Sequence, residues 1–206
     1  MTISSEVQVV AARLDPGPHE ASAAALSLSQ AERSRAARFR FERERRRFIV
    51  SRARLRELLA ERLDVPPESI EFVYGREGKP ALAERFARSG WRFNLSHCGE
   101  LAVYAFSRAR EVGIDIEAIR PVDEADAIAA RFFAPGERRA FRSLEQEARN
   151  TGFLRLWTRK ESLAKGLGAG LAVPLEELDA SAPPRGWSVE SFSPEPGFIG
   201  ALAVQE

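Results

Sequence analysis

The chain has 206 residues, enough for one large domain or two domains of about 100 residues each. It is 44% hydrophobic and 30% charged, as expected of a globular protein, and no apolar run approaches the roughly 18 residues of a membrane-spanning helix. The single cysteine, Cys98, excludes intrachain disulfides and cysteine-rich zinc sites, and the first residues lack the layout of a signal peptide, so we expect a cytoplasmic protein with no membrane partner.

Hydrophobic spacing and turn residues predict a series of strands and helices. Ser29 and Glu32 form a capping box at the start of a helix, and the glycines after Leu167 end a long one. We expect strands at 6–14, 70–74, 91–95, 101–106, 112–117, 187–192 and 198–204, and helices at 30–38, 42–64, 123–133, just after Pro135, and at 146–167. The strands and helices come in blocks, which favours an α+β fold.

A short internal repeat indicates two halves. The sequence Ala-Ala-Arg-Phe occurs at 36–39 and again at 129–132, and at the same offset of 93 residues Glu-Arg-Arg occurs at 44–46 and at 137–139. A chain rich in Ala and Arg also produces such matches by chance. We place the boundary so that residues 1–107 form the first half and 108–206 the second.

The charges are unevenly distributed. Residues 32–62 contain twelve Arg and five Glu, a local net charge of +7 in a chain whose total is +1. This indicates either an anionic ligand near this segment or a solvated helix with Glu–Arg pairs one turn apart. Only three of the 31 basic residues are lysines, Lys79, Lys160 and Lys165, which makes these three positions candidates for a role that needs a compact ammonium group.

Two carboxylates lie within a segment that otherwise resembles a buried strand. Side chains alternate along a strand, so Asp115 and Glu117 share one face and Ile114 and Ile116 the other. If the acidic face is solvated, the pair has no special role. If it faces a cleft, it can bind a divalent cation, which prefers oxygen ligands.

Two further segments could carry chemistry. On the helix at 146–167, Trp157, Glu161 and Lys165 lie along one stripe, either as a site or as an ordinary surface Glu–Lys pair beside a packed aromatic. His97, placed just past the strand at 91–95, is either a phosphate-contacting imidazole or a structural histidine in a turn. Ser96 lacks the Gly-x-Ser-x-Gly elbow of a hydrolase.

Four motifs in order resemble those of the 4′-phosphopantetheinyl transferases, in the larger class typified by the surfactin synthetase activator. They are Gly-Lys-Pro at 78–80, Asn-x-Ser-His at 94–97, Gly-Ile-Asp-Ile-Glu at 113–117 and Trp-x-x-Lys-Glu-Ser-x-x-Lys at 157–165. The resemblance extends from about Leu28 to Leu171. Cys98 stands where serine is familiar in this family.

The resemblance implies a fold of two similar halves related by a pseudo-twofold axis, each a small antiparallel sheet packed against a long helix. It implies transfer of the phosphopantetheine arm of coenzyme A to a serine of an apo acyl or peptidyl carrier protein, with release of 3′,5′-adenosine bisphosphate. By motif position Mg²⁺ would be held by Asp115, Glu117 and Glu161. Coenzyme A would be contacted by Arg35, Lys79, Asn94, Ser96, His97 and Lys165, with Glu161 and Lys165 catalytic.

Several alternatives remain open from the sequence. They are a non-catalytic coenzyme A-binding or carrier-binding relative, an Arg-rich nucleic-acid binder, and a magnesium-dependent phosphoryl or nucleotidyl transferase of another family. We expect no nucleic-acid partner, because that function leaves the carboxylates and Lys165 unexplained. A pseudo-dimeric chain has no need of a partner subunit, so a monomer is expected. The sequence does not identify the carrier protein or its pathway.

Overall fold

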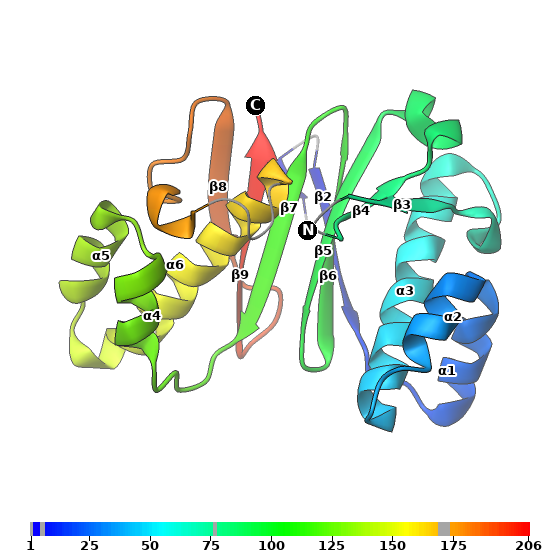
Figure 1. Ribbon diagram of the computed structural model, residues 1–206, viewed down its shortest axis with the longest axis horizontal. Coiled ribbons are helices and arrows are strands. Elements are labelled where there is room, and N and C mark those ends of the chain that lie inside the picture. Colours follow the sequence, from blue (N-terminus) through cyan, green and yellow to red (C-terminus); the bar gives the residue numbers. More distant parts are fainter. Residues whose placement is uncertain (1, 5–6, 76–77, 169–173) are drawn as a thin grey trace.

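The computed structural model describes residues 2–4, 7–75, 78–168 and 174–206 and has an α+β fold (Figure 1). The first part contains an antiparallel sheet in the order β1-β2-β6-β5, a two-stranded hairpin β3-β4 and three α-helices. Its strands are β1 (Thr2–Ser4), β2 (Val7–Arg13), β3 (Phe72–Tyr74), β4 (Pro80–Leu82), β5 (Trp91–Cys98) and β6 (Leu101–Arg108). Its helices are α1 (Pro18–Ala24), α2 (Gln30–Ala36) and α3 (Glu42–Leu63), with 3₁₀ turns at Ala25–Ser27, Pro67–Ser69 and Glu84–Ser89.

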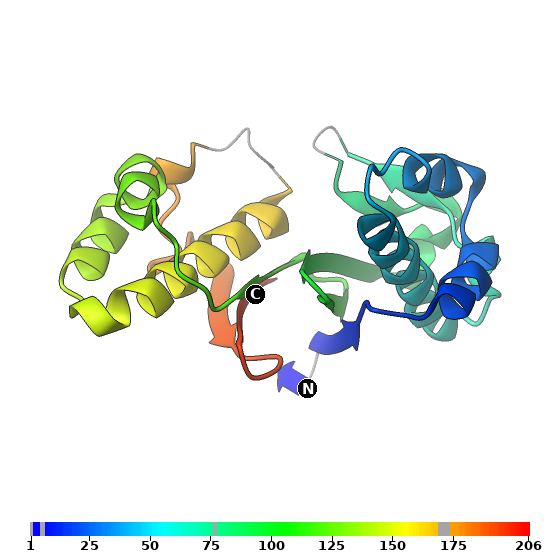
Figure 2. The ribbon, with the colours of Figure 1, turned by 90° about the horizontal axis from the view of Figure 1, so that it is seen from below.

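The second part contains an antiparallel sheet in the order β7-β9-β8 and three α-helices. The elements are β7 (Val112–Ala118), α4 (Ala125–Phe132), α5 (Pro135–Arg142), α6 (Gln146–Leu167), a 3₁₀ turn (Leu175–Glu177), β8 (Trp187–Phe192) and β9 (Phe198–Gln205). Figure 2 shows the helices of the two parts on opposite sides, with the strands between them. No helix in the described part of the chain is long and apolar enough to cross a membrane.

Most predicted elements are confirmed, and the helix predicted at 146–167 has the predicted bounds. It ends at Gly168, whose positive φ of 69° favours glycine. One placement was wrong: β5 continues to Cys98, so His97 lies within a strand and not in a turn. The sequence did not predict β1, β4 or α1. The two tracts that match at an offset of 93 residues are not a structural repeat, because residues 44–46 lie in α3 and residues 137–139 lie in α5.

Each long helix packs on its own sheet, and the two sheets share a core. The α3 residues Leu55 and Leu59 pack against Phe93 and Phe106 of the first sheet. Strand β7 contributes Ile114 and Ile116 to a cluster that contains residues of both sheets: Val7, Val9, Leu101, Val103, Ala105, Phe198 and Leu202. The apolar face predicted for β7 is therefore buried, so the other face of this strand points away from the shared core.

The edge strands β5 and β7 are joined through side chains, although they belong to different sheets. Asn94 Oδ1 accepts a hydrogen bond from the Ile114 amide at 3.0 Å, and Cys98 Sγ accepts one from the Ala118 amide at 3.3 Å. The hydrogen-bonding groups of an edge strand must be satisfied when buried, and here side chains of β5 do so. This arrangement fixes β5 and β7 side by side, at the boundary between the two parts.

Each long helix also carries a buried ion pair with the short helix before it. On α3, Arg56 contacts Glu32 of α2 at 2.7 Å and donates to the carbonyls of Pro67 and Ile70. On α6, Lys160 contacts Glu137 of α5 at 2.7 Å and donates to the carbonyls of Leu175 and Leu178. Lys160 is therefore a structural residue.

We expect Lys160→Met to destabilise the protein by about 3–5 kcal/mol, because it leaves the fully buried carboxylate of Glu137 without its counter-charge. Urea unfolding followed by circular dichroism measures this loss. Arg155→Met, on the exposed face of the same helix, is the control and should change stability by less than about 0.5 kcal/mol. Equal losses in the two variants would contradict the role given to Lys160.

Candidate active site

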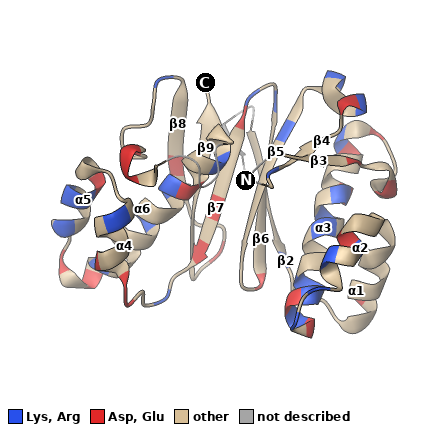
Figure 3. Cartoon of the chain, in the orientation of Figure 1, with Lys and Arg blue, Asp and Glu red and all other residues tan. Residues whose placement is uncertain are grey.

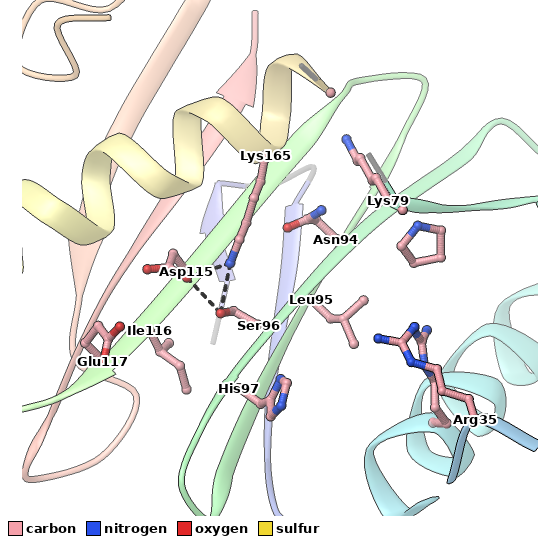
Figure 4. Close-up of a pocket in the computed structure, with 14 residues that line it drawn as sticks. Arg35, Lys79, Asn94, Leu95, Ser96, His97, Asp115, Ile116, Glu117 and Lys165 are labelled. Atoms are coloured by element: carbon pink, nitrogen blue, oxygen red, sulfur yellow. Dashed lines mark hydrogen bonds and ion pairs between the residues drawn. The ribbon is translucent and has the colours of Figure 1, made fainter. Parts of the chain in front are cut away.

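A cavity of about 460 Å³ lies at the boundary between the two parts and is lined by residues from both. The predicted site residues on its wall are Arg35, Lys79, Asn94, Ser96, His97, Asp115, Glu117 and Lys165. Figure 4 shows Asp115 and Glu117 on one side and Arg35 on the other, with the β5 side chains between them. The structure thus brings together eight of the nine predicted residues; Glu161 is not on the cavity wall.

Strand alternation produces the acidic side of the cavity. Because Ile114 and Ile116 are buried in the shared core, Asp115 and Glu117 project from the opposite face. Both carboxylates lie on the cavity wall, which confirms that they share a face that is not simply solvated. Asp115 is 6% exposed.

Two glycines bring α6 close to this strand. A Cβ added at Gly113 would lie 2.0 Å from the Ser162 carbonyl oxygen and 2.3 Å from the Gly166 amide nitrogen. Gly113 therefore allows backbone to pack directly on backbone, and the last turns of α6 come within side-chain reach of β7. This close approach accounts for the glycine two residues before Asp115 in the sequence.

Lys165, near the end of α6, contacts the acidic side directly. Its Nζ lies 2.6 Å from Asp115 Oδ1 and 3.1 Å from Ser96 Oγ, and Ser96 Oγ donates to the same Oδ1 at 2.8 Å (Figure 4). No hydrogen bond from the described residues reaches Asp115 Oδ2. The two contacts on Oδ1 orient the carboxylate and leave its second oxygen available.

The surroundings of Glu161 and Glu117 disfavour the charged form of each carboxylate. Burial raises the pKa of Glu161 above its usual range, and the negative charges of Asp115 and Glu117 raise it further. Burial and the charge of Asp115 likewise raise the pKa of Glu117. Within the described ranges, no three Asp, Glu, His or Cys side chains are arranged to hold a metal ion. The metal role of Asp115, Glu117 and Glu161 therefore stays a prediction.

We expect Glu161→Gln to stabilise the metal-free protein at pH 8 by about 0.5–2 kcal/mol, since it removes a charge that folding makes unfavourable. The raised pKa means that wild-type Glu161 takes up a proton as the pH falls through that pKa, so the difference should shrink at pH 5. Thermal melts in a chelating buffer at both pH values measure it. Glu147→Gln, exposed on the same helix, should give no gain in stability. A similar gain there would argue against an unfavourable charge specific to Glu161.

Strand β5 contributes three polar side chains to the cavity, and their partners limit what each can do. The oxygen of Asn94 is bonded to β7, so its amide nitrogen is the group left to donate. His97 is exposed to the cavity, and partial desolvation together with the charges of Lys165 and Arg52 lowers its pKa, which favours the neutral imidazole. Cys98 donates from Sγ to Glu117 Oε2 at 3.5 Å, so it contacts a predicted metal ligand.

Lys79 reaches the cavity from the first part and contacts the second. Its Nζ lies 3.3 Å from Glu111 Oε2 and 3.4 Å from the carbonyl oxygen of Gly166. Lys79 is therefore held at the boundary between the parts, on the cavity wall.

The arginines of 32–62 are mostly paired with other protein groups. Pairs one turn apart join Glu42 to Arg45 and Arg46, and Glu57 to Arg54. Figure 3 shows basic and acidic residues interspersed on α3. Two arginines of this segment line the cavity: Arg35, which the sequence predicted, and Arg52, which it did not. No local signal distinguishes Arg52 from its neighbours.

Comparison with known proteins decides the family. The family model described as the 4′-phosphopantetheinyl transferase superfamily matches residues 111–196, and the model for the N-terminal part of 4′-phosphopantetheinyl transferases matches residues 12–109. The chain is 39% identical to 4′-phosphopantetheinyl transferase HetI of Nostoc sp., over 77% of this chain and 70% of HetI. The chain belongs to the 4′-phosphopantetheinyl transferases.

Other members of the family match over a shorter span. The transferase psf-1 of Bacillus pumilus is 36% identical over 66% of this chain, and AcpT of Escherichia coli is 36% identical over 61%. The matches cover 55% of psf-1 and 61% of AcpT. A solved holo-[acyl-carrier-protein] synthase of Thermotoga maritima matches 47% of this chain and 62% of that chain, with 23% identity and a TM-score of 0.36. The transferase motifs at 78–80, 94–97, 113–117 and 157–165 all fall within the matched family regions.

Proposed function

We propose that this phosphopantetheinyl transferase acts on coenzyme A and an apo carrier protein, forming the holo carrier and 3′,5′-adenosine bisphosphate. The observation that carries the proposal is the cavity, with Asp115 and Glu117 on one side and arginines on the other. A carboxylate side suits a diphosphate with its divalent cation, and an arginine side suits a further phosphate. Membership of the 4′-phosphopantetheinyl transferases indicates which reaction this cavity serves.

The acidic residues carry the oxygen ligands that a magnesium ion prefers. Asp115 has a free Oδ2, and the pKa values of Glu117 and Glu161 are raised in part by repulsion that a bound cation would relieve. We infer that these three carboxylates hold Mg²⁺. When bound, Mg²⁺ would neutralise diphosphate charge and polarise the phosphorus under attack.

The side chains around this site would position the substrate. Lys165 and Ser96 orient Asp115, and Lys165 places a positive charge beside the bond to be broken. The amide nitrogen of Asn94, the neutral His97 and Lys79 supply donors to phosphate oxygens. In phosphoryl transfer, most of the catalysis comes from such positioning and charge neutralisation.

In the reaction, the serine oxygen of the carrier forms a bond to the β-phosphorus of coenzyme A. The bond between that phosphorus and the oxygen bridging to the adenosine side breaks, and the electron pair leaves with 3′,5′-adenosine bisphosphate. Glu161 accepts the serine proton, directly or through water. Lys165 stabilises the charge on the departing oxygen.

We also infer that residues 1–107 and 108–206 are equivalent halves related by a pseudo-twofold axis. Each has a helix of 22 residues that pairs a buried cation with a glutamate of the preceding short helix, Arg56 with Glu32 and Lys160 with Glu137. In each case the same cation donates to two carbonyls three residues apart. Because one chain supplies both sides of the cavity, we propose a monomer, acting on carriers in the cytoplasm.

The test is incubation with coenzyme A, MgCl₂ and several apo carrier proteins, followed by mass spectrometry of the carriers. We expect a mass gain of one phosphopantetheine, dependent on Mg²⁺, and formation of 3′,5′-adenosine bisphosphate. Binding of coenzyme A without transfer to any carrier would instead indicate a non-catalytic relative.

A further inference from the structure

Alternate side chains of β5 hydrogen-bond to β7, although the two strands belong to different sheets. Residues two apart on a strand project from the same face, so these bonds form a ladder of side chains between the strands. The bonds join Asn94 to Ile114, Ser96 to Asp115, and Cys98 to Glu117 and Ala118. The ladder therefore places one hydrogen-bonding side chain of β5 against each acidic residue of β7.

The two carboxylates on this ladder are held to different degrees. Asp115 accepts from Ser96 at 2.8 Å and from Lys165 at 2.6 Å. Among the residues that the structure describes, only Cys98 hydrogen-bonds to the carboxylate of Glu117, from Sγ to Oε2 at 3.5 Å. Ordering the long side chain of a glutamate costs conformational entropy, so the orientation of Glu117 before a cation binds depends on this contact.

A second hydrogen bond fixes the sulfur of Cys98. Its Sγ accepts from the Ala118 amide at 3.3 Å, and the half-buried side chain packs against the core that the two sheets share. The amide occupies the acceptor side of the sulfur, and the thiol proton is donated to the carboxylate of the residue before that amide. Cys98 therefore joins the two strands and orients Glu117 with the same atom.

We propose that Cys98 is a positioning residue for the metal site, because its thiol holds Oε2 of Glu117 and leaves Oε1 available on the acidic side of the cavity. This rests on the proposed function, since it takes Glu117 as a metal ligand. A thiol is a soft ligand, whereas Mg²⁺ prefers oxygen, so Cys98 acts through Glu117 and does not bind the ion itself.

The test measures metal affinity as well as activity. Electron paramagnetic resonance gives the affinity for Mn²⁺ with coenzyme A present and no carrier protein, corrected for Mn²⁺ bound by coenzyme A alone. A hydrogen bond of ordinary strength corresponds to roughly a three- to tenfold change in a binding constant, so Cys98→Ala should weaken Mn²⁺ binding by about that factor. The KM for coenzyme A at saturating Mg²⁺ should stay within about twofold. Cys98→Ser, whose hydroxyl both donates and accepts, should keep Mn²⁺ affinity within about twofold of wild type.

The control is Ser89→Ala, which removes a side chain that makes the same two kinds of bond away from the cavity. Ser89 Oγ donates to the Phe86 carbonyl at 2.7 Å and accepts from the Trp91 amide at 3.3 Å. This variant should lower the midpoint of unfolding in urea and leave Mn²⁺ affinity unchanged. An equal loss of Mn²⁺ affinity in Ser89→Ala and Cys98→Ala would mean a general destabilisation and would overturn the proposal.

A double-mutant cycle shows whether Cys98 acts through Glu117. In a Glu117→Gln background the ligand is already removed, so Cys98→Ala should cause no further loss of Mn²⁺ affinity. The same loss in both backgrounds would contradict the proposal. If Cys98→Ala does not fold, Cys98→Val fills the space without a donor and should show the same loss of affinity; wild-type affinity there would count against the positioning role.

The outcomes separate this proposal from the function on which it rests. Wild-type Mn²⁺ affinity in Cys98→Ala, or equal losses in Cys98→Ala and Cys98→Ser, would overturn the role of the thiol while transfer by the wild-type enzyme stands. The expected loss in Cys98→Ala with recovery in Cys98→Ser supports it. A wild-type protein that neither binds Mn²⁺ nor transfers phosphopantetheine would refute both.

Discussion

Asp115→Asn should reduce phosphopantetheine transfer by at least about 100- to 1000-fold, the usual cost of removing one preorganised electrostatic group. The change keeps the shape of the side chain, and asparagine can still accept from Lys165 and Ser96 through its oxygen. It removes the charge and replaces one carboxylate oxygen with an NH₂ group, which cannot bind a cation. We therefore expect normal folding, little activity, and weaker Mn²⁺ binding as measured by electron paramagnetic resonance.

The control for this variant is Asp126→Asn, which changes an exposed aspartate paired with Arg149 on the surface of the second part. It should leave both transfer and Mn²⁺ binding close to wild type. If Asp115→Asn kept wild-type Mn²⁺ binding and lost only activity, Asp115 would act through Lys165 and not as a metal ligand. If it kept wild-type activity, the carboxylate would have no part in the reaction.

The sequence predicted that Asp115 and Glu117 share one face of a strand, because the relevant signal is local. Alternation along β7 depends on adjacent residues, and the burial of Ile114 and Ile116 is evident from their type. The bounds of α6 follow in the same way from hydrophobic spacing and from the glycine at its end. Such patterns need no knowledge of what packs against them.

Features that depend on distant segments were not predictable. Whether an arginine of α3 faces the cavity depends on how α2 and β5 pack around it, so Arg52 could not be distinguished from Arg54 or Arg47. Lysine scarcity identified three residues, and the structure separates them by their surroundings: Lys79 and Lys165 on the cavity wall, Lys160 in a buried ion pair. The match at an offset of 93 residues did not identify equivalent elements, because residues 44–46 lie in α3 and residues 137–139 in α5.

The side-chain links between β5 and β7 show why the site is placed where it is. Asn94, Ser96 and Cys98 each bond to β7, through Ile114, Asp115 and Ala118. The same strand exposes His97 to the cavity. Two of the residues that join the sheets, Asn94 and Ser96, also lie on the cavity wall, so a change in the junction should also move the acidic side.

Gly113→Ala should give the largest loss of stability, because its Cβ would meet backbone atoms of α6 at 2.0 and 2.3 Å. Those atoms cannot move unless the helix shifts away from β7, and overpacking alone typically costs about 1–3 kcal/mol even where side chains can adjust. We expect a loss above about 4 kcal/mol, a large part of the roughly 5–15 kcal/mol that keeps a protein folded, seen as poor soluble yield or a strongly lowered midpoint in urea. Any folded fraction should also lose transfer, because Lys165 would move away from Asp115.

Alanine substitutions at two further glycines should cost less stability than the one at Gly113. At Gly166 a Cβ would meet the ring of Trp187 at 2.5 Å, and a side chain can turn where a backbone cannot, so Gly166→Ala should cost less than Gly113→Ala. At Gly17 the nearest atom is 4.0 Å away and φ is −61°, so Gly17→Ala should be close to wild type. A shift of α6 large enough to admit a methyl group should cost more than about 1 kcal/mol. If the free energy of unfolding of Gly113→Ala lay within that range of the wild-type value, the direct packing of α6 on β7 could not be what holds Lys165 and Asp115 together.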